Sequence, residues 1–268
     1  MGGDDAPDVV VAGAIQALRE SDEEIEVLLF GPEEKVQTAL DEQDPSATRA
    51  GAIHVVHAPD VIDMAEAPAS AVKRKPDSSI HYGLQAQKRR EADAFISAGN
   101  TGAVMAASIF VLGRVPGVER PSIAGYFPTL EGFSTVLDIG TNVDCKPGHL
   151  LQFARMGTVY AQQVHGNAEP SVGLLNIGEE PGKGNEQVKA AYEQLRDADD
   201  IHFQGNVEGQ DLLFYAADII ICDGFVGNIL LKFGETMTTV LSEMTQQEMD
   251  RQGLSAGERK LVAGVLGE

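Results

Sequence analysis

Strand-like and helix-like segments alternate along the whole chain, and this alternation restricts its possible folds more than any other feature. Such alternation is typical of an α/β fold with a mostly parallel, doubly wound sheet that helices cover on both faces. A first helix is expected at 7–20, because Pro7 suits a first helical turn. The predicted strands are 25–30, 53–56, 93–97, 134–139, 171–177 and 218–222. We expect one α/β domain over 1–268, with a helical extension at 225–268 as a dimer or membrane contact.

Polar loops rich in Gly, Asn and Asp follow four of the predicted strands. In open α/β sheets, ligands gather at the carboxyl ends of the strands. The pattern therefore predicts that these loops surround one site, although Gly, Asn and Asp are also the ordinary residues of turns. The loops are 97–103, 138–145, 176–186 and 222–228.

The first of these loops reads SAGNTGA and precedes an apolar segment, 103–112, that is predicted to be a helix. Glycines allow a ligand to approach the backbone closely, and free N–H groups at a helix start attract anions. The loop therefore predicts phosphate binding, and a tight turn with Asn or Thr as helix cap is the alternative. The phosphate candidates are Ser97, Gly99, Asn100, Thr101 and Gly102, with Asn142 of the second loop.

The charge balance excludes some partners. With 20 Lys and Arg against 41 Asp and Glu, the chain has a formal net charge of −21. A general nucleic-acid surface needs clustered positive charge, so nucleic acid is not expected as a partner. The acidic excess also resembles that of proteins from organisms living at high salt. Two basic clusters stand out, at 73–75 and 88–90, and a solvated helix face is their ordinary explanation.

Several site classes find no support in the sequence. Two cysteines, Cys145 and Cys222, have no metal-ligand spacing and cannot form a disulfide framework, which favours a reducing, cytoplasmic compartment. No apolar run approaches the roughly 18 residues that span a bilayer, and the N-terminus lacks signal-peptide order. Gly182-Lys183-Gly184 has Ile177 and Gly184 where a P-loop needs Gly and Ser or Thr. G-x-G-x-x-G and G-x-S-x-G are also missing, so we expect no cofactor and no metal.

A series of short motifs, in order over about residues 1–235, resembles the bacterial phosphate acyltransferases of phospholipid synthesis. They are Met1-Gly2-Gly3-Asp4-Asp5-Ala6-Pro7, Lys75-Pro76-Asp77-Ser78-Ser79-Ile80, SAGNTGA, Leu112-Gly113-Arg114, Val143-Asp144-Cys145, Asn176-Ile177-Gly178-Glu179-Glu180, Lys183-Gly184-Asn185-Glu186, Gly205-Asn206-Val207-Glu208-Gly209 and Cys222-Asp223-Gly224-Phe225-Val226-Gly227-Asn228. The resemblance implies transfer of a fatty acyl group from acyl carrier protein to inorganic phosphate, which gives acyl phosphate. It also implies a homodimer, peripheral membrane association at the inner face, and a fold like isocitrate and isopropylmalate dehydrogenases and phosphotransacetylases.

Three departures from the family pattern lead to further expectations. The chain begins at Met1, where family members usually have a preceding strand, and it stops at Glu268 before an apolar, Gly-rich segment. We therefore expect that it lacks the first strand and the C-terminal segment. Met64-Ala65-Glu66 replaces the more usual Met-Asp-Glu, which leaves the acidic role of that loop open.

The implied reaction needs positioning more than a protein nucleophile, because phosphate is already an anionic nucleophile and a thiolate leaves readily. Lys183, Asn185 and Asn228 are the candidate donors to phosphate or to the developing oxyanion, provided that Glu179 and Glu180 point away. Lys183 as an exposed loop lysine is the alternative. Asp138, Asp144 and Asp223 are expected to orient loops, with a general-base role as the alternative.

The remaining candidates concern the two substrates. Cys145 has no recognisable base, so direct attack of phosphate without an acyl-enzyme is predicted. Apolar residues at helical spacing within 225–249 could line an acyl groove, form a dimer contact or belong to the core. The basic residues proposed to dock the acidic carrier protein are Lys73, Arg74, Lys75, Lys88, Arg89 and Arg90. A dehydrogenase of similar fold and a non-catalytic phosphate or acyl-phosphate binding protein are the competing functions.

Overall fold

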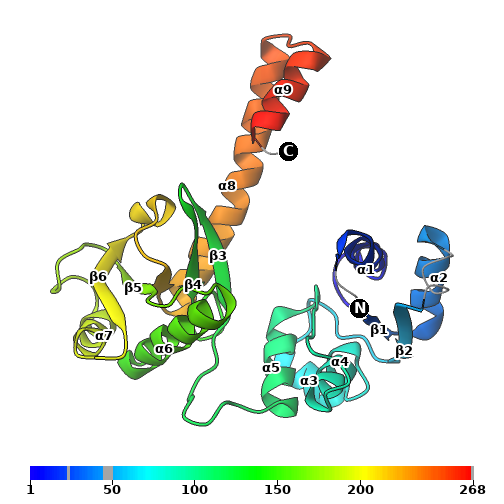
Figure 1. Ribbon diagram of the computed structural model, residues 1–268, viewed down its shortest axis with the longest axis horizontal. Coiled ribbons are helices and arrows are strands. Elements are labelled where there is room, and N and C mark those ends of the chain that lie inside the picture. Colours follow the sequence, from blue (N-terminus) through cyan, green and yellow to red (C-terminus); the bar gives the residue numbers. More distant parts are fainter. Residues whose placement is uncertain (23–24, 45–50, 267–268) are drawn as a thin grey trace. The chain divides into compact units, whose positions relative to one another are not determined.

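The computed structural model describes residues 1–22, 25–44 and 51–266. The chain divides into two compact units, Met1–Gly117 and Val118–Glu268, where the sequence predicted a single domain. Figure 1 shows the elements of each unit along the chain. The last two residues of the predicted helical extension, 267 and 268, lie outside the described residues.

The first unit combines a parallel strand pair with five helices in its described part. Val27 to Gly31 pair in parallel with Ile53 to His57, as the alternation predicted. One apolar cluster packs helices around this pair through Val11, Leu29 and Leu40, and a second joins the remaining helices through Ile80 and Ala107. The elements are α1 (Asp8–Glu20), β1 (Val27–Gly31), α2 (Glu33–Gln43), β2 (Ile53–His57), α3 (Pro68–Arg74), α4 (Ser79–Lys88) and α5 (Thr101–Val111).

The second unit is built on a sheet with strand order β3-β4-β7-β5-β6. The pairs β4–β7, β7–β5 and β5–β6 are parallel, and β3 joins β4 as an antiparallel hairpin at the edge. The elements are β3 (Ala124–Thr129), β4 (Gly132–Leu137), α6 (Pro147–Val164), β5 (Ser171–Asn176), α7 (Glu186–Arg196), β6 (His202–Glu208), the 3-10 helix η1 (Asp211–Phe214), β7 (Ile219–Ile221), α8 (Gly224–Arg251) and α9 (Ala256–Leu266).

The central strand β7 shows how the sheet is covered on both faces. Its neighbouring side chains point to opposite faces because side chains alternate along a strand. Ile219 and Ile221 pack in the apolar cluster that includes Phe153 of α6 and Leu195 of α7, whereas Ile220 packs in the cluster that includes Leu212 of η1. The mostly parallel α/β sheet is therefore covered as the sequence predicted.

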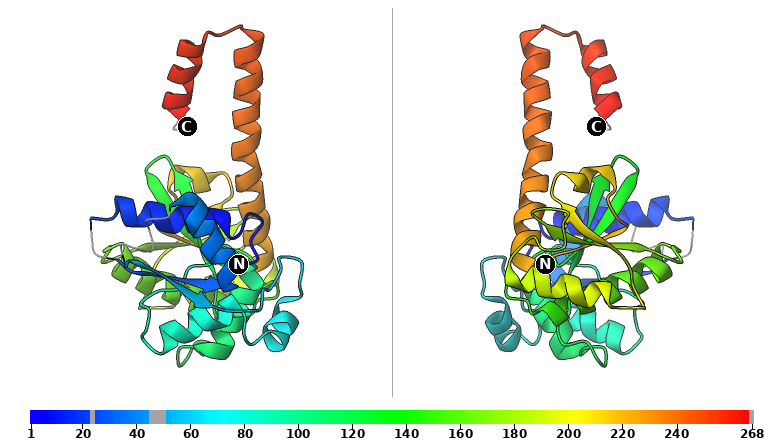
Figure 2. Two further views of the ribbon diagram at one scale, coloured as in Figure 1. Left: turned by 90° about the vertical axis from the view of Figure 1, so that its right-hand side faces the viewer. Right: turned by 90° about the vertical axis from the view of Figure 1, so that its left-hand side faces the viewer.

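Helix α8 begins against this sheet and then leaves it. Leu230 and Leu231 in its first part pack on the second apolar cluster of the unit. Further along, α8 projects beyond the sheet with α9 turned back beside its end, as both views of Figure 2 show. There Leu241 and Met244 are 56% and 60% exposed, so this part of the helix is no core stripe.

The strands differ from the sequence prediction at three places. Residues 93–97 pair with no strand in the described part of the chain, and Ile96 is 92% exposed while Phe95 packs beside Gly83. The sequence missed β3, whose Gly125 and Pro128 are poor strand residues that an edge tolerates. It also missed β6, which has few apolar residues.

Candidate functional site

Three of the four predicted loops follow neighbouring strands of the second unit. The loop 138–145 follows β4, the loop 222–228 follows β7, and the loop 176–186 follows β5. These strands are adjacent and parallel, so their carboxyl ends lie at one edge of the sheet. The predicted convergence is confirmed for these three loops, and the fourth, 97–103, belongs to the first unit and is described by itself.

Asp138 organises the loop after β4 from inside the protein. Its side chain is fully buried, and its carboxylate accepts hydrogen bonds from the N–H groups of Gly140, Thr141 and Asn142 at 3.0, 2.9 and 2.8 Å. The Asn142 Nδ2 amide donates to the same carboxylate at 2.6 Å and to the Pro121 carbonyl at 2.8 Å. Asp138 therefore orients this loop, as predicted.

The phosphate prediction for Asn142 needs correction on the same evidence. Its side chain is buried, and an amide nitrogen has two hydrogens to donate. Both are used by Pro121 and Asp138. Asn142 holds the loop and keeps no side-chain donor for an anion.

The first turn of α8 packs directly on this loop. The Gly224 N–H donates to the Asn142 carbonyl at 2.8 Å, and any Cβ at Gly227 would lie 1.8 Å from the Asp138 carbonyl oxygen. Asp223 caps the helix by accepting a bond from the Val226 N–H at 2.9 Å, which is a loop-orienting role. Asn228 is exposed and lies beside Gly140.

The loop after β5 presents Lys183 and Asn185. Its backbone is held by Asn176, whose Nδ2 amide donates to the Lys183 carbonyl at 3.1 Å, and by Asn206, which donates to the Glu180 carbonyl at 2.9 Å. Asn185 caps α7 by accepting a bond from the Val188 N–H at 2.9 Å, so its side-chain oxygen is used.

The charge on Lys183 is not unopposed. Its Nζ lies 3.8 Å from a carboxylate oxygen of Glu180, and both side chains are about half exposed or more. The condition that Glu180 point away is therefore not met in this structure. Exposed ion pairs of this kind contribute little stability, so the pair costs little to open when an anion competes for the lysine.

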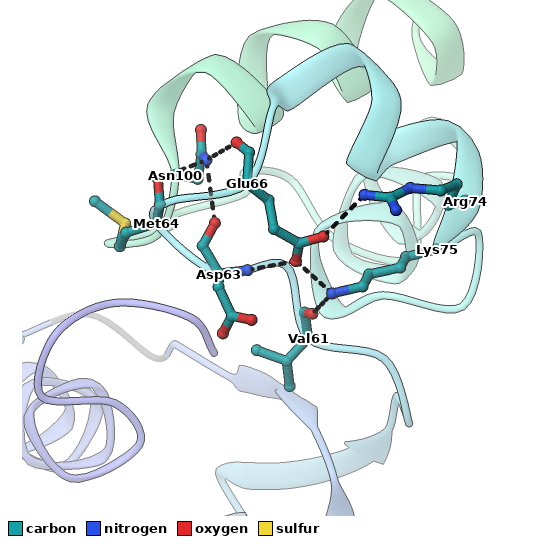
Figure 3. Close-up of polar contacts among 7 residues, drawn as sticks. All are labelled: Val61, Asp63, Met64, Glu66, Arg74, Lys75 and Asn100. Atoms are coloured by element: carbon teal, nitrogen blue, oxygen red, sulfur yellow. Dashed lines mark hydrogen bonds and ion pairs between the residues drawn. The ribbon is translucent and has the colours of Figure 1, made fainter.

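In the first unit, Asn100 has a different task from the predicted one. It is buried, its Oδ1 caps α5 by accepting a bond from the Ala103 N–H at 3.0 Å, and its Nδ2 amide faces three backbone carbonyls at 3.1–3.2 Å. Those carbonyls belong to Asp63, Met64 and Glu66, as Figure 3 shows. The prediction of phosphate contact by the Asn100 side chain is corrected, because no donor remains on it.

What the loop 97–103 still offers an anion is its backbone and two hydroxyls. The Gly99 N–H already donates to the Ser97 Oγ at 3.2 Å. Thr101 and Gly102 are exposed in the first turn of α5, where N–H groups precede the first intrahelical bond. A Cβ on Gly102 would lie 2.6 Å from the Pro68 ring, so glycine is needed there for packing.

Sequence reasoning left the role of Glu66 open, and the structure makes it a central contact. Its carbonyl faces Asn100, while its carboxylate accepts bonds from the Lys75 Nζ, the Asp63 N–H at 3.0 Å and Arg74 at 3.3 Å (Figure 3). The Lys75 hydrogen bond, followed by the bond from Asp63, lowers the pKa of Glu66. The signal in the sequence was an acidic residue upstream of a basic cluster, which is too common to identify such a pair.

The predicted docking lysines are partly occupied by these contacts. Lys75 is half-buried and donates to Glu66 and to the Val61 carbonyl at 2.6 Å. Lys88 donates to the Val111 carbonyl at 2.5 Å. Both therefore contribute contacts within the first unit, and their assignment as docking residues stays a prediction.

The chemistry of the other candidates is limited by burial. Burial raises the pKa of the Cys145 thiol to about 11, and its Sγ lies 3.2 Å from the Asn142 carbonyl.

In the described ranges, no three His, Cys, Asp or Glu side chains are grouped as metal ligands would be. None of the helices in the described ranges is both long and apolar enough to cross a membrane.

The chain is similar to known proteins over nearly all of its sequence. A family model described as fatty acid synthesis protein matches residues 1–265. The phosphate acyltransferase of Salinibacter ruber is 70% identical over 268 residues, which is all of this chain and 79% of that protein. The phosphate acyltransferase of Chlorobaculum parvum is 48% identical over 272 residues, covering 100% of this chain and 79% of that protein.

Two solved structures are similar in fold. The phosphotransacetylase EutD from Staphylococcus aureus has a TM-score of 0.51 at 14% identity, covering 85% of this chain and 87% of its own. A branched-chain phosphotransacylase from Enterococcus faecalis V583 has a TM-score of 0.54 at 14% identity, and the match covers 86% of this chain and 81% of that one. The α/β fold therefore resembles that of phosphotransacetylases. The family match and the sequence identity together show that this chain belongs to the phosphate acyltransferases, enzymes of the fatty acid synthesis protein family.

Proposed function

We propose that this chain transfers a fatty acyl group from acyl carrier protein to inorganic phosphate and releases acyl phosphate for phospholipid synthesis. The observation that carries the proposal is the 70% identity to a phosphate acyltransferase over all 268 residues. The loops at one edge of the sheet also support it. Lys183 and Asn185 belong to the loop after β5, Asn228 belongs to the loop after β7, and these two strands are neighbours.

In the proposed reaction a phosphate oxygen attacks the thioester carbonyl carbon. A C–O bond forms, the C–S bond breaks, and the carrier leaves as a thiolate that takes up a proton. The negative charge that develops on the carbonyl oxygen needs a donor, and one well-aimed donor is worth roughly 3 kcal/mol. Lys183, Asn185 and Asn228 are proposed as these donors.

Phosphate binding by the loop 97–103 is proposed through its backbone. The N–H groups of Thr101 and Gly102 at the start of α5 and the hydroxyls of Ser97 and Thr101 are the groups that suit an anion. Asn100 contributes indirectly, because it fixes the backbone from which these groups project.

Direct attack of phosphate is favoured over a covalent acyl-enzyme. A thiol acts as a nucleophile through its thiolate, and the raised pKa of Cys145 keeps that thiol protonated near neutral pH. The proposed scheme therefore assigns no covalent intermediate to Cys145.

We also propose that α8 serves the acyl chain or a second copy of the chain. Exposed apolar side chains of this kind mark interaction surfaces, and here they lie along the part of α8 beyond the sheet. A homodimer and a peripheral membrane contact both suit this helix, and the oligomeric state is tested below.

The proposed function is tested by mixing the protein with acyl carrier protein thioester and inorganic phosphate and following acyl phosphate by phosphorus NMR. We expect a new acyl phosphate signal together with one free carrier thiol for each acyl phosphate formed. A control without phosphate should release no thiol. Thiol release at the same rate with and without phosphate would mean hydrolysis and would contradict the proposal.

A further inference from the structure

The two basic clusters of the sequence meet at one end of the first unit. At the end of α3, the Lys73 Nζ lies 5.7 Å from the centroid of the Phe110 ring on α5. At the end of α4, the Lys88 Nζ donates to the Val111 carbonyl at 2.5 Å. The C-terminal ends of α3 and α4 therefore both lie at the C-terminal end of α5, and this placement brings Lys73 to the same end of the unit as Lys88, which Arg89 and Arg90 directly follow.

The charges in these clusters differ in the contacts they already make within the first unit: only Lys75 is partly buried, whereas Arg74 and Lys88 are exposed although each makes a contact. Lys75 and Lys88 are committed to Glu66 and to the Val111 carbonyl, and Arg74 also contacts Glu66. Lys73, Arg89 and Arg90 are exposed. Arg89 contacts Gln85 at 3.3 Å on its own helix, an exposed contact that a partner can displace.

An apolar surface accompanies these exposed charges. Phe110 is 56% exposed under the Lys73 ammonium, and Leu112, which follows it at the end of α5, is 42% exposed. An apolar centre with a polar rim is the usual composition of a protein interface. We call the set Lys73, Arg89, Arg90, Phe110 and Leu112 the α5-end surface.

The charge of this region is opposite to that of the whole chain. Residues 67–117 hold seven Lys and Arg against three Asp and Glu, which leaves 13 of the 20 cations and 38 of the 41 anions for the rest of the chain. An acidic protein is therefore repelled by most of the sequence and attracted here. Such complementarity steers association and fixes where a partner lands.

We propose that the α5-end surface docks an acidic protein, the acyl carrier protein that brings the thioester, with Phe110 against an apolar patch of the carrier and Lys73, Arg89 and Arg90 against its carboxylates. This inference rests on the proposed function for the identity of the partner. It replaces the six basic residues of the sequence prediction with three, and adds an apolar centre that charge counting does not reveal.

The test compares two acyl donors with the whole 268-residue chain. Lys73→Glu, Arg89→Glu and Arg90→Glu are combined in one variant, Phe110→Ala is a second, and Lys35→Glu is the matched control, because Lys35 is exposed on α2 of the same unit. At low salt, kcat/KM with the carrier-protein thioester should fall by about tenfold or more in the first variant. A coenzyme A thioester should react unchanged, and Lys35→Glu should match the parent with both donors.

A binding titration with fluorescently labelled carrier protein gives a readout that needs no turnover. The triple variant and Phe110→Ala should each bind more weakly than Lys35→Glu, and the salt dependence of binding should decrease in the triple variant. Failure of the proposed function would appear separately, as absence of acyl phosphate from both donors with the unmodified chain.

Three outcomes would overturn the docking surface. Equal slowing of both donors would mean that the substitutions disturb the fold or the reaction, and unchanged carrier binding would mean that the carrier lands elsewhere. The protein could also be mixed with vesicles that contain about one-third anionic lipid. If vesicle binding depended on Lys73 and Phe110 while carrier binding did not, the surface would be assigned to a membrane, and this would equally contradict the proposal.

Discussion

The side-chain amide of Asn100 donates a hydrogen bond to the backbone carbonyl of Glu66 over 3.1 Å. Glu66 turns its carboxylate the other way, to Lys75 and Arg74. The loop 61–66 is thus fixed from both sides, by an amide that caps α5 and by a cationic pair at the end of α3. Asn100 therefore holds the loop 61–66 in place and caps α5, in addition to belonging to the candidate phosphate loop.

Replacing Asn100 by Leu should destabilise the first unit by about 2–4 kcal/mol, because it removes a helix cap and the amide donor that faces the carbonyls of Asp63, Met64 and Glu66. Thermal unfolding measures this effect. Asn100→Asp, which keeps the cap but presents oxygens to the carbonyls, should also be less stable than the parent. Thr101→Val is the control and should weaken phosphate saturation while leaving the melting temperature within about 2 °C. Unchanged stability of Asn100→Leu would show that these bonds contribute nothing.

Replacing Lys183 by Met should lower kcat/KM for acyl phosphate formation by about a hundredfold, the effect of losing one charged donor to the reacting groups. The chain offers a matched control in Lys189. Both lysines lie 3.8 Å from a glutamate three residues earlier, Glu180 and Glu186, and both are about half exposed. Lys189→Met should keep the parent rate. Equal losses in the two variants would assign Lys183 to the surface.

Glu180→Gln tests the same site in the opposite direction. Removing the carboxylate beside Lys183 should lower the phosphate concentration needed for half-saturation, because the lysine charge is then unopposed. The comparison variant is Glu186→Gln, which should leave phosphate saturation unchanged. Weaker phosphate binding by Glu180→Gln would mean that the carboxylate helps the site.

Cys145→Ala should retain most activity. Burial raises the pKa of this thiol to about 11, so little thiolate exists at neutral pH. Mass spectrometry of the unmodified protein after incubation with acyl donor, without phosphate, should show no acyl adduct. An acyl group trapped on Cys145, together with a loss of activity by about a thousandfold in Cys145→Ala, would instead require a covalent intermediate.

Asp218 should make the stability of the protein depend on pH in the acid range. Burial opposes its charged form, but bonds from Ser171 and from the Tyr215 hydroxyl outweigh that effect and lower the pKa of Asp218. A lowered pKa gives stability that is present above the unfolded pKa and is lost as pH falls below about 4. Urea unfolding of Asp218→Asn should lack this acid dependence.

Tyr215, whose hydroxyl donates a hydrogen bond to Asp218, should make stability depend on pH in the alkaline range. The hydrogen bond to Asp218, followed by burial, raises the pKa of Tyr215 from 10 to about 12. Its contribution to stability is therefore complete below pH 10 and is lost between about pH 10 and 12. Tyr215→Phe should be less stable at pH 8 and should lose less stability over the alkaline range than the parent. Identical alkaline slopes would show that this bond carries no such linkage.

Exposed apolar residues on α8 should govern the oligomeric state. Leu241→Glu together with Met244→Glu should shift the protein toward monomer in sedimentation, since a charge in an apolar contact is costly to bury. Glu243→Gln, on the same exposed stretch, is the control and should leave the assembly unchanged. A double variant that sediments like the parent would remove this face from the dimer contact.

The sequence by itself determined the α/β character of the chain and most of its strands. Strand spacing and apolar content are local properties, so β1, β2, β4, β5 and β7 could be placed within a few residues. The roles of Asp138 and Asp223 were also predictable, because a short acidic side chain at the end of a strand readily accepts neighbouring N–H bonds. The family motifs were readable for the same reason, since each is a contiguous loop.

Only the tertiary structure decided which polar groups are used internally. Asn100, Asn142, Lys75 and Lys88 looked like free donors in the sequence, yet each bonds to a group distant along the chain, which no local pattern records. The division into two units and the meeting of the basic clusters beside Phe110 arise in the same way, from contacts between segments far apart in sequence. A donor is available to a ligand only when folding leaves it without an internal acceptor, and folding alone decides that.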